Sequence, residues 1–152
     1  MVVALFTGSQ IGQKTLKNSD YYAGESGRAE RTLDRSGLNP PAGEMVLAQS
    51  KHAKATDPEF RAAVADVTRR VSRVPVVKNV RSPYAPGGSI SKDGHSALVQ
   101  FDIRGDSEKA EDKVAPVMAQ VAAAQRAHSN LRVEEFGDAS HLADERQRLA
   151  FA

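Results

Sequence analysis

A strand, helix, strand unit occurs twice in this sequence, and this repeat restricts the fold more than any other feature. The two copies run over the segments 44–51, 57–73 and 76–82, and then 96–104, 107–128 and 131–136. Two such units joined by a hairpin-like link are typical of the ferredoxin-like fold, a split βαβ arrangement. We therefore expect an α+β domain in which a four-stranded antiparallel sheet carries both helices on one face.

The spacing of apolar residues supports the two helices. Apolar side chains recur at intervals of four, three, four and three residues, which places them on one stripe of a helix. In the first helix the stripe is Phe60, Val64, Val67, Val71 and Val74, and in the second it is Ala110, Val114, Val117, Val121 and Ala124. Each helix is therefore predicted to bury one face against the sheet.

The helix ends carry recognisable signals. Thr56 and Glu59 have the spacing of a capping box, and Pro58 stands in the first turn, where its missing N–H costs nothing. Ser107 is the expected cap of the second helix. Pro116 lies inside the predicted 107–128 helix, where proline removes a hydrogen bond. We therefore expect a bend at Pro116.

Further helices are predicted outside the repeat. Residues 19–36 are expected to form a short helix, which a Gly- and Pro-rich stretch at 37–43 separates from the first strand. Residues 138–152 have the pattern of an amphipathic helix. The predicted division is thus an N-terminal segment with a helical arm (1–43), a ferredoxin-like domain (44–137) and a C-terminal helix.

The first six residues, MVVALF, form the longest apolar run, which is far short of the ~20 residues that cross a bilayer. The run is compatible with a first strand, a poor signal peptide, or the last turn of a membrane helix.

Composition indicates an ordinary globular domain. The 152 residues are 40% hydrophobic and 26% charged, and 21 basic residues nearly balance 19 acidic ones. A net charge of +2 is weak support for nucleic-acid binding, since a solvated surface of mixed sign is the better explanation. The absence of cysteine excludes disulfides and thiolate metal sites.

Motifs for catalysis are weak. Gly87 and Gly88 lack the GK[ST] ending of a phosphate-binding loop, so a plain turn is the better interpretation. His141 and Glu145 have a helical spacing but offer only two metal ligands. Glu134 and its neighbour Glu135 point to opposite faces of a strand and cannot act as an acid and base pair. We therefore predict no catalytic, metal-binding or cofactor-binding residues, and no enzyme activity.

Two other classes of function are compatible with the fold. A stand-alone ferredoxin-like module could bind a small ligand or RNA, although the central strands lack the pair of aromatic residues with which such sheets stack bases. An acylphosphatase-like enzyme needs an arginine and an asparagine over a phosphate-binding loop, which this sequence does not show.

Several segments together resemble one family of transporters. ISKDGHSALVQFDIRG is similar to the "S-x-DG-x-x-a-l-v-x-x-x-l-x-G" hairpin in the first extracytoplasmic loop of the MMPL transporters (mycobacterial membrane protein large), a branch of the resistance-nodulation-division superfamily. VVKNVRSP resembles the preceding "V-x-x-V-x-S-P" strand, DPEFRAAVADVTRRV their helix, and GESGRAERTLDRSGL the segment after their first membrane helix. The similarity covers roughly residues 20 to 140, with the elements in the same order.

The resemblance implies a function that the composition does not. It implies an extracytoplasmic porter domain of a proton-driven exporter in the cell membrane, which pairs with a second porter domain and with membrane helices of the same transporter. The substrates implied are lipids, antibiotics or other hydrophobic compounds, and nucleic acid is not among the partners. MVVALF would then be the end of the first membrane helix. Candidate contacts along the substrate path are Tyr21, Tyr22, Tyr84, Ala85 and Pro86.

The arm before the first repeat suggests a mode of self-association. Residues 13–38 carry apolar side chains, and the linker SGLNPPAG could carry them away from their own sheet. The apolar positions are Leu16, Tyr21, Tyr22, Ala29 and Leu33. Because exchange of an identical element is a low-cost route to dimers, we expect the isolated chain to form a weak homodimer by swapping this arm.

Overall fold

The computed structural model describes residues 24, 25, 28, 29, 32, 36 and 40–150, with side chains up to residue 145. The chain divides into two compact units, residues 1–38 and 39–152. In the first unit the described residues are helical, and the Thr32 hydroxyl donates to the Arg28 carbonyl at 2.9 Å. Most of the predicted 19–36 helix, and the MVVALF run, lie outside the described residues.

The second unit is built on one antiparallel sheet. Its strands are β1 (Gly43–Gln49), β2 (Val77–Arg81), β3 (Ser89–Ile90), β4 (Ser96–Ile103) and β5 (Arg132–Gly137). The order is β2-β4-β1-β5, and the short β3 pairs with β4. β1 is central: Val46 lies opposite Val99 of β4 and opposite Glu135 of β5. This order, with every pair antiparallel, confirms the predicted ferredoxin-like arrangement.

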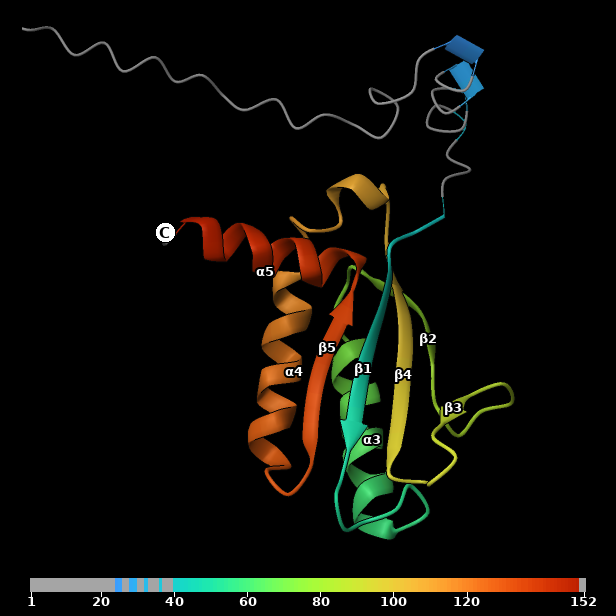
Figure 1. Ribbon diagram of the computed structural model, residues 1–152, viewed down its shortest axis with the longest axis vertical. Helices are drawn as coiled ribbons and strands as arrows, with labels where there is room; N and C mark the ends of the chain where they lie inside the picture. The colour runs from blue at the N-terminus through green and yellow to red at the C-terminus, as the bar shows by residue number, and fades with distance from the viewer. Residues whose placement is uncertain (1–23, 26–27, 30–31, 33–35, 37–39, 151–152) are drawn as a thin grey trace, which may run out of the picture. The chain divides into compact units, whose positions relative to one another are not determined.

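Three helices complete the unit. α3 (Pro58–Ser72) and α4 (Ala115–Ala127) pack on each other and on the same face of the sheet, and none of the helices of this unit that the structure describes lies on the other face, which we call the open face (Figure 1). α5 (Asp138–Ala150) follows β5 directly and lies across the end of the sheet where β1 begins. Among the described residues, no helix combines the length and the apolar character that crossing a bilayer requires.

The core lies between the sheet and the two helices. Strands β1 and β4 alternate between buried and half-buried side chains along their whole length. The buried set faces the helices. Every residue of both predicted stripes is buried, although Val74 follows the end of α3 and Ala110 and Val114 precede α4. With few aromatic side chains in the chain, Phe60 and Phe101 are the largest of the fully buried residues. Valine and alanine fill most of the remaining space.

The start of the second helix differs from the prediction. In place of one bent helix over 107–128, a short 3-10 turn, η1 (Ser107–Lys109), precedes α4, which begins at Ala115. Pro116 therefore occupies the first turn of α4, where its missing N–H is not needed, and no bend is required. Ala110 and Val114 are buried from the connection between η1 and α4.

Both predicted caps are also displaced by one residue. Asp57, not Thr56, precedes α3, and its side chain accepts a hydrogen bond from the Lys54 N–H instead of capping the helix. The carboxylate of Asp106, not the hydroxyl of Ser107, accepts from the Glu108 N–H at 3.0 Å. In both places an aspartate adjacent to the predicted residue accepts the N–H of a loop or turn: Asp57 follows Thr56, and Asp106 precedes Ser107.

A polar cluster fastens α3 to α4. Asp66, whose side chain is only 10% exposed, accepts hydrogen bonds from Arg70 Nε at 2.7 Å and from Arg69, and it lies 3.1 Å from His128 Nε2 at the end of α4. Burial acts to raise the pKa of Asp66, but the hydrogen bonds from Arg70 and His128 and the charges of both arginines outweigh it, so the pKa is lowered. The ionised carboxylate therefore stabilises the contact between the helices.

We predict that Asp66→Asn lowers the free energy of unfolding at pH 7 by about 1–3 kcal/mol, because the arginines and His128 lose an ionised acceptor. A lowered pKa contributes stability above the ordinary value of 3.8 that is lost as the pH falls. The difference from the parent chain should therefore shrink below pH 4. Urea denaturation across pH tests this, with the exposed Glu59→Gln on α3 as the control. Equal stability of Asp66→Asn and the parent at pH 7 would contradict it.

Candidate functional site

The predicted substrate-path residues occupy the loop between β2 and β3, as far as the structure describes them. Ala85 and Pro86 are exposed at its tip. Tyr84 is half-buried: its hydroxyl donates to the Ala55 carbonyl at 2.8 Å, and the Arg61 guanidinium lies 4.2 Å from its ring centre. Burial raises the pKa of the Tyr84 phenol despite the opposing charge of Arg61. Tyr21 and Tyr22 lie outside the described residues.

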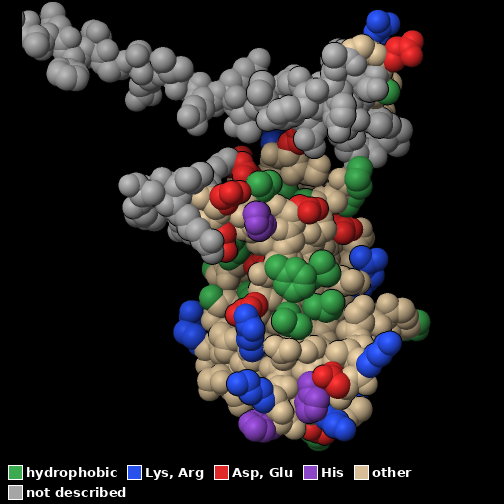
Figure 2. Space-filling model, in the orientation of Figure 1, with side chains coloured by type: hydrophobic (Ala, Val, Ile, Leu, Met, Phe, Trp, Pro, Cys, Tyr) green, Lys and Arg blue, Asp and Glu red, His purple; other side chains and the backbone are tan. Residues whose placement is uncertain are grey.

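The open face of the sheet carries a group of apolar side chains, which we call the sheet patch: Met45, Leu47, Leu98 and Phe136. Met45 lies opposite Phe136, and Leu47 lies opposite Leu98, so the four are neighbours on one face. Phe136 is 43% exposed. Figure 2 shows hydrophobic side chains gathered in the middle of this face, with charged groups around them. An exposed apolar group with a polar rim is typical of a surface that contacts a partner or ligand.

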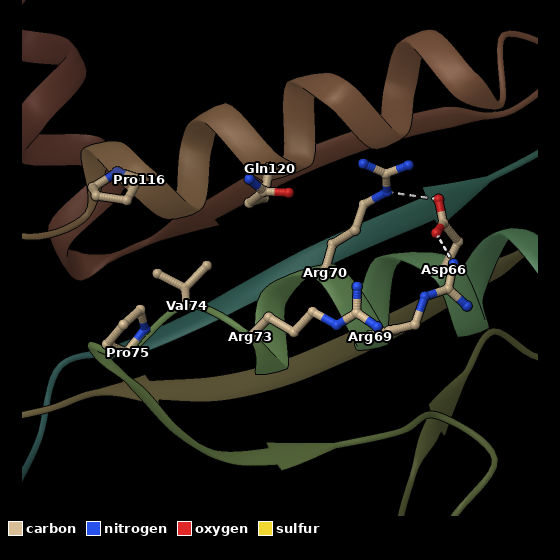
Figure 3. Close-up of a pocket in the computed structure, with 8 residues that line it drawn as sticks. All are labelled: Asp66, Arg69, Arg70, Arg73, Val74, Pro75, Pro116 and Gln120. Atoms are coloured by element: carbon tan, nitrogen blue, oxygen red, sulfur yellow. Dashed lines mark hydrogen bonds and ion pairs between the residues drawn. The ribbon is translucent and has the colours of Figure 1, made fainter.

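A groove of about 490 Å³ lies between α3 and α4 (Figure 3). Arginines dominate it; the residues that line it are Asp66, Arg69, Arg70, Arg73, Val74, Pro75, Pro116 and Gln120. Three guanidinium groups and one carboxylate line the groove, so it is positively charged. Such a polar, charged groove is unlike the mostly apolar pockets that enclose small hydrophobic molecules.

A second hollow, of about 440 Å³, lies between the end of β1 and the connection from α4 to β5. Two of its polar side chains, Gln125 and Ser50, form hydrogen bonds with the backbone of neighbouring turns. The Gln125 side chain accepts from the Val133 N–H at 2.6 Å and donates to the Leu131 carbonyl at 2.9 Å. The Ser50 hydroxyl accepts from the backbone N–H groups of His52 and Ala53. These groups close turns and leave little for a ligand.

A buried carboxylate, that of Glu44, lies beneath the first turn of α5. Glu44, at the start of β1, is 1% exposed. Its Oε1 accepts hydrogen bonds from the N–H groups of Ala139 at 2.6 Å and Ser140 at 3.2 Å, in the first turn of α5. Glu44 thus supplies the negative charge that a helix N-terminus favours. Its other oxygen, Oε2, has no hydrogen-bond partner among the described residues.

Gly137 makes this approach possible. A Cβ at this position would stand 2.6 Å from Glu44 Cδ and 2.6 Å from the Gly43 carbonyl oxygen. Neither contact can be accommodated without displacing the carboxylate or the backbone, so a residue without a side chain is needed beside Glu44.

Glu135 of β5 is a second acidic residue on the same face. Both its carboxyl oxygens are buried, and neither has a hydrogen-bond partner in the described part of the chain. Burial, together with the carboxylates of Glu44 and Asp144, raises the pKa of Glu135 to about 8. At neutral pH this side chain is therefore mostly protonated and uncharged.

The pair was missed from sequence, although the strand pattern contains the signal. Glu44 is two residues before Val46, and Glu135 is two after Val133, so each shares the buried face of its strand. The expectation that Glu134 and Glu135 point to opposite faces is correct: Glu134 is exposed and pairs with Arg132 at 2.7 Å. Within the described ranges no group of three or more acidic or histidine side chains could hold a metal ion.

Comparisons with known proteins place the chain in a family. No curated protein matches it. One solved structure that resembles it is described as mycobacterial membrane protein MmpL11D2, with 19% sequence identity, a TM-score of 0.46, and coverage of 61% of this chain and 99% of that one. The model of the MMPL family matches residues 22–151, which is nearly the whole sequence and agrees with the hairpin, strand and helix motifs that resemble these transporters. The chain therefore belongs to the MMPL family.

Proposed function

We propose that this chain is the extracytoplasmic porter domain of a proton-driven membrane exporter, and that it forms part of the path taken by lipids, antibiotics or other hydrophobic compounds. Membership of the MMPL family is the observation that carries the proposal. In this role the domain acts by moving and by shaping a surface, and the chemistry of proton transport takes place in membrane helices of the same transporter.

The position of the two connections supports this role. Glu44, at the start of the first strand, lies opposite Gly137, at the end of the last one. The chain therefore enters the sheet and leaves it toward α5 at the same end of the domain (Figure 1). A domain inserted between two membrane helices needs this geometry, because both connections must face the bilayer.

The open sheet face is the surface that we assign to the companion porter domain. The sheet patch is apolar and lies on the flat face of the sheet, where a second sheet or helix could cover it. Ser89 of β3 pairs with Leu98, so the loop carrying Tyr84, Ala85 and Pro86 adjoins the patch. We propose that this loop lines the cleft between the two domains and contacts the substrate, together with Tyr21 and Tyr22.

The proposed mechanism is mechanical. α3 and α4 are packed on the sheet through a continuous core and are joined to each other by Asp66, so the unit can move as one body. When protonation shifts the membrane helices, such a body can open and close a cleft against its partner.

The side of the membrane can be tested by cysteine labelling, since the natural sequence of this domain has no cysteine. In a full-length transporter otherwise free of cysteine, we predict that a membrane-impermeant maleimide labels Ala85→Cys in intact cells, because Ala85 is exposed. Ala97→Cys, at a position only 1% exposed, is the control and should react only after unfolding. Labelling of Ala85→Cys only in broken cells would place the domain on the cytoplasmic side.

The substrate path can be tested with a matched pair of alanines. Ala85 and Ala127 are both exposed, but Ala127 lies at the end of α4, away from the proposed cleft. We predict that coupling a bulky maleimide to Ala85→Cys reduces export of a fluorescent lipid by at least about tenfold, since a blocked path loses flux in proportion to its occupancy. Coupling at Ala127→Cys should leave export unchanged, and a protonophore defines the level without export. Equal export by the two labelled variants would remove the loop from the path.

Exchange of the N-terminal arm, residues 13–38, between two copies of the chain is a separate proposal. Lacking a companion domain, the isolated chain is expected to exchange residues 13–38 with a second copy and to form a weak dimer. Sedimentation should show a weight-average mass that rises with concentration for the whole chain and not for a chain that starts at residue 39. A monomer at high concentration in both cases would contradict it.

A further inference from the structure

The carboxyl groups of Glu44 and Glu135 are neighbours on the helix-covered face of the sheet. Glu44 lies opposite Gly137, and Val46 lies opposite Glu135, so the two glutamates occupy diagonal positions on adjacent strands. Diagonal neighbours on one face are roughly 7 Å apart at the backbone, which long side chains can span. Their three oxygens without partners, Glu44 Oε2 and both of Glu135, are buried in the same region.

α5 closes this region. The Ala139 and Ser140 N–H groups bind Glu44, and both residues are at most 4% exposed. The first turn of α5 therefore contacts the start of β1 at the Glu44 carboxylate. Lifting this turn would remove both hydrogen bonds to Glu44 and open the region of the two carboxyl groups to water.

The charged groups that act on Glu135 are all acidic. They are Glu44 from β1 and Asp144 from α5. The single charged residue of α4, Arg126, lies in its last turn, at the end of the helix away from α5. α3 contributes Asp66, which is held by Arg69, Arg70 and His128. In the described part of the chain, no cation is found among the groups that shift Glu135.

We propose that Glu135 is a proton-binding site that controls the docking of α5: when Glu135 holds a proton, the first turn of α5 stays on the sheet, and when it loses the proton, that turn is released. The ligand is a proton, and the moving element is the first turn of α5.

The physical reason is the cost of a second buried negative charge. The positive end of α5 and two N–H donors stabilise one carboxylate, that of Glu44. A charged Glu135 has no donor and faces two acidic neighbours, so burying it is strongly unfavourable. Protonated Glu135 avoids this penalty, because an uncharged carboxyl group costs far less to bury than a carboxylate.

The sign of the effect follows from the direction of the shift. The pKa of Glu135 is raised from an ordinary value of 4.5 to about 8 when α5 is docked. A raised pKa means that the docked state binds the proton more tightly than the open state. The stabilisation of docked α5 by the proton on Glu135 is therefore complete below about pH 4.5, and it is lost as the pH rises through about 8.

Two measurements on the 152-residue chain test the inference. Carbon-detected NMR should show the Glu135 carboxyl titrating near pH 8, well above the ordinary value of 4.5 for glutamate. Amide hydrogen exchange should show protection of Ala139 and Ser140, corrected for intrinsic rates, falling by about tenfold per pH unit between pH 6 and 8, because opening releases one proton. Titration of Glu135 below pH 6, or constant protection over this range, would overturn the proposal.

Substitutions separate the proton site from general instability. Glu135→Gln is uncharged at every pH, so protection of Ala139 and Ser140 should no longer depend on pH. Glu134→Gln removes the adjacent exposed carboxylate and should keep the pH dependence of the parent. If the protection of Ala139 and Ser140 in Glu135→Gln still fell with pH as steeply as in the parent chain, another group would be responsible. That result would overturn the proposal. The NMR titration needs no variant, so the test stands even if Glu135→Gln folds poorly.

Discussion

The central position of β1 is the constraint on which the rest of this domain depends. Because β1 pairs with β4 on one side and β5 on the other, its register fixes which residues of three strands face the helices. A slip of one residue would bring Val46 and Ala48 to the open face and expose the core. The same register places Glu44 under the first turn of α5, so one set of strand pairings determines both the hydrophobic core and the buried carboxyl groups.

Much of this arrangement could be predicted from sequence, because the strong signals are local and periodic. The valines of α3 recur with a period that only a helix satisfies, and the alternation in EMVLAQ and SALVQF gives two strands with a defined buried face. The order of these elements, together with the MMPL motifs, predicts the fold and the family. The turn at Lys92, Asp93 and Gly94 also has a local origin, because glycine tolerates the φ of +75° that Gly94 adopts and the Asp93 side chain accepts the His95 N–H.

Features set by long-range contacts could not be predicted in the same way. Pro116 reads as a kink within a long periodic pattern, yet η1 interrupts that pattern and places proline in a first turn. Asp66 looks like a solvated residue of α3 until His128, 62 positions later, is brought beside it. Glu44 and Glu135 lie on buried faces by strand parity, but their environment depends on α5 folding back over the end of the sheet, which no local signal specifies.

We propose that a rigid ferredoxin-like body carries a helix, α5, whose docking responds to protons. The central claim, that the end of the sheet containing Glu44 and Gly137 faces the membrane in an MMPL transporter, can be tested most directly by cryo-electron microscopy of the full-length protein. We predict that this end points to the bilayer, with α5 between the sheet and the following membrane helix and the sheet patch turned toward a second domain. A structure in which this end points away from the bilayer would contradict the account.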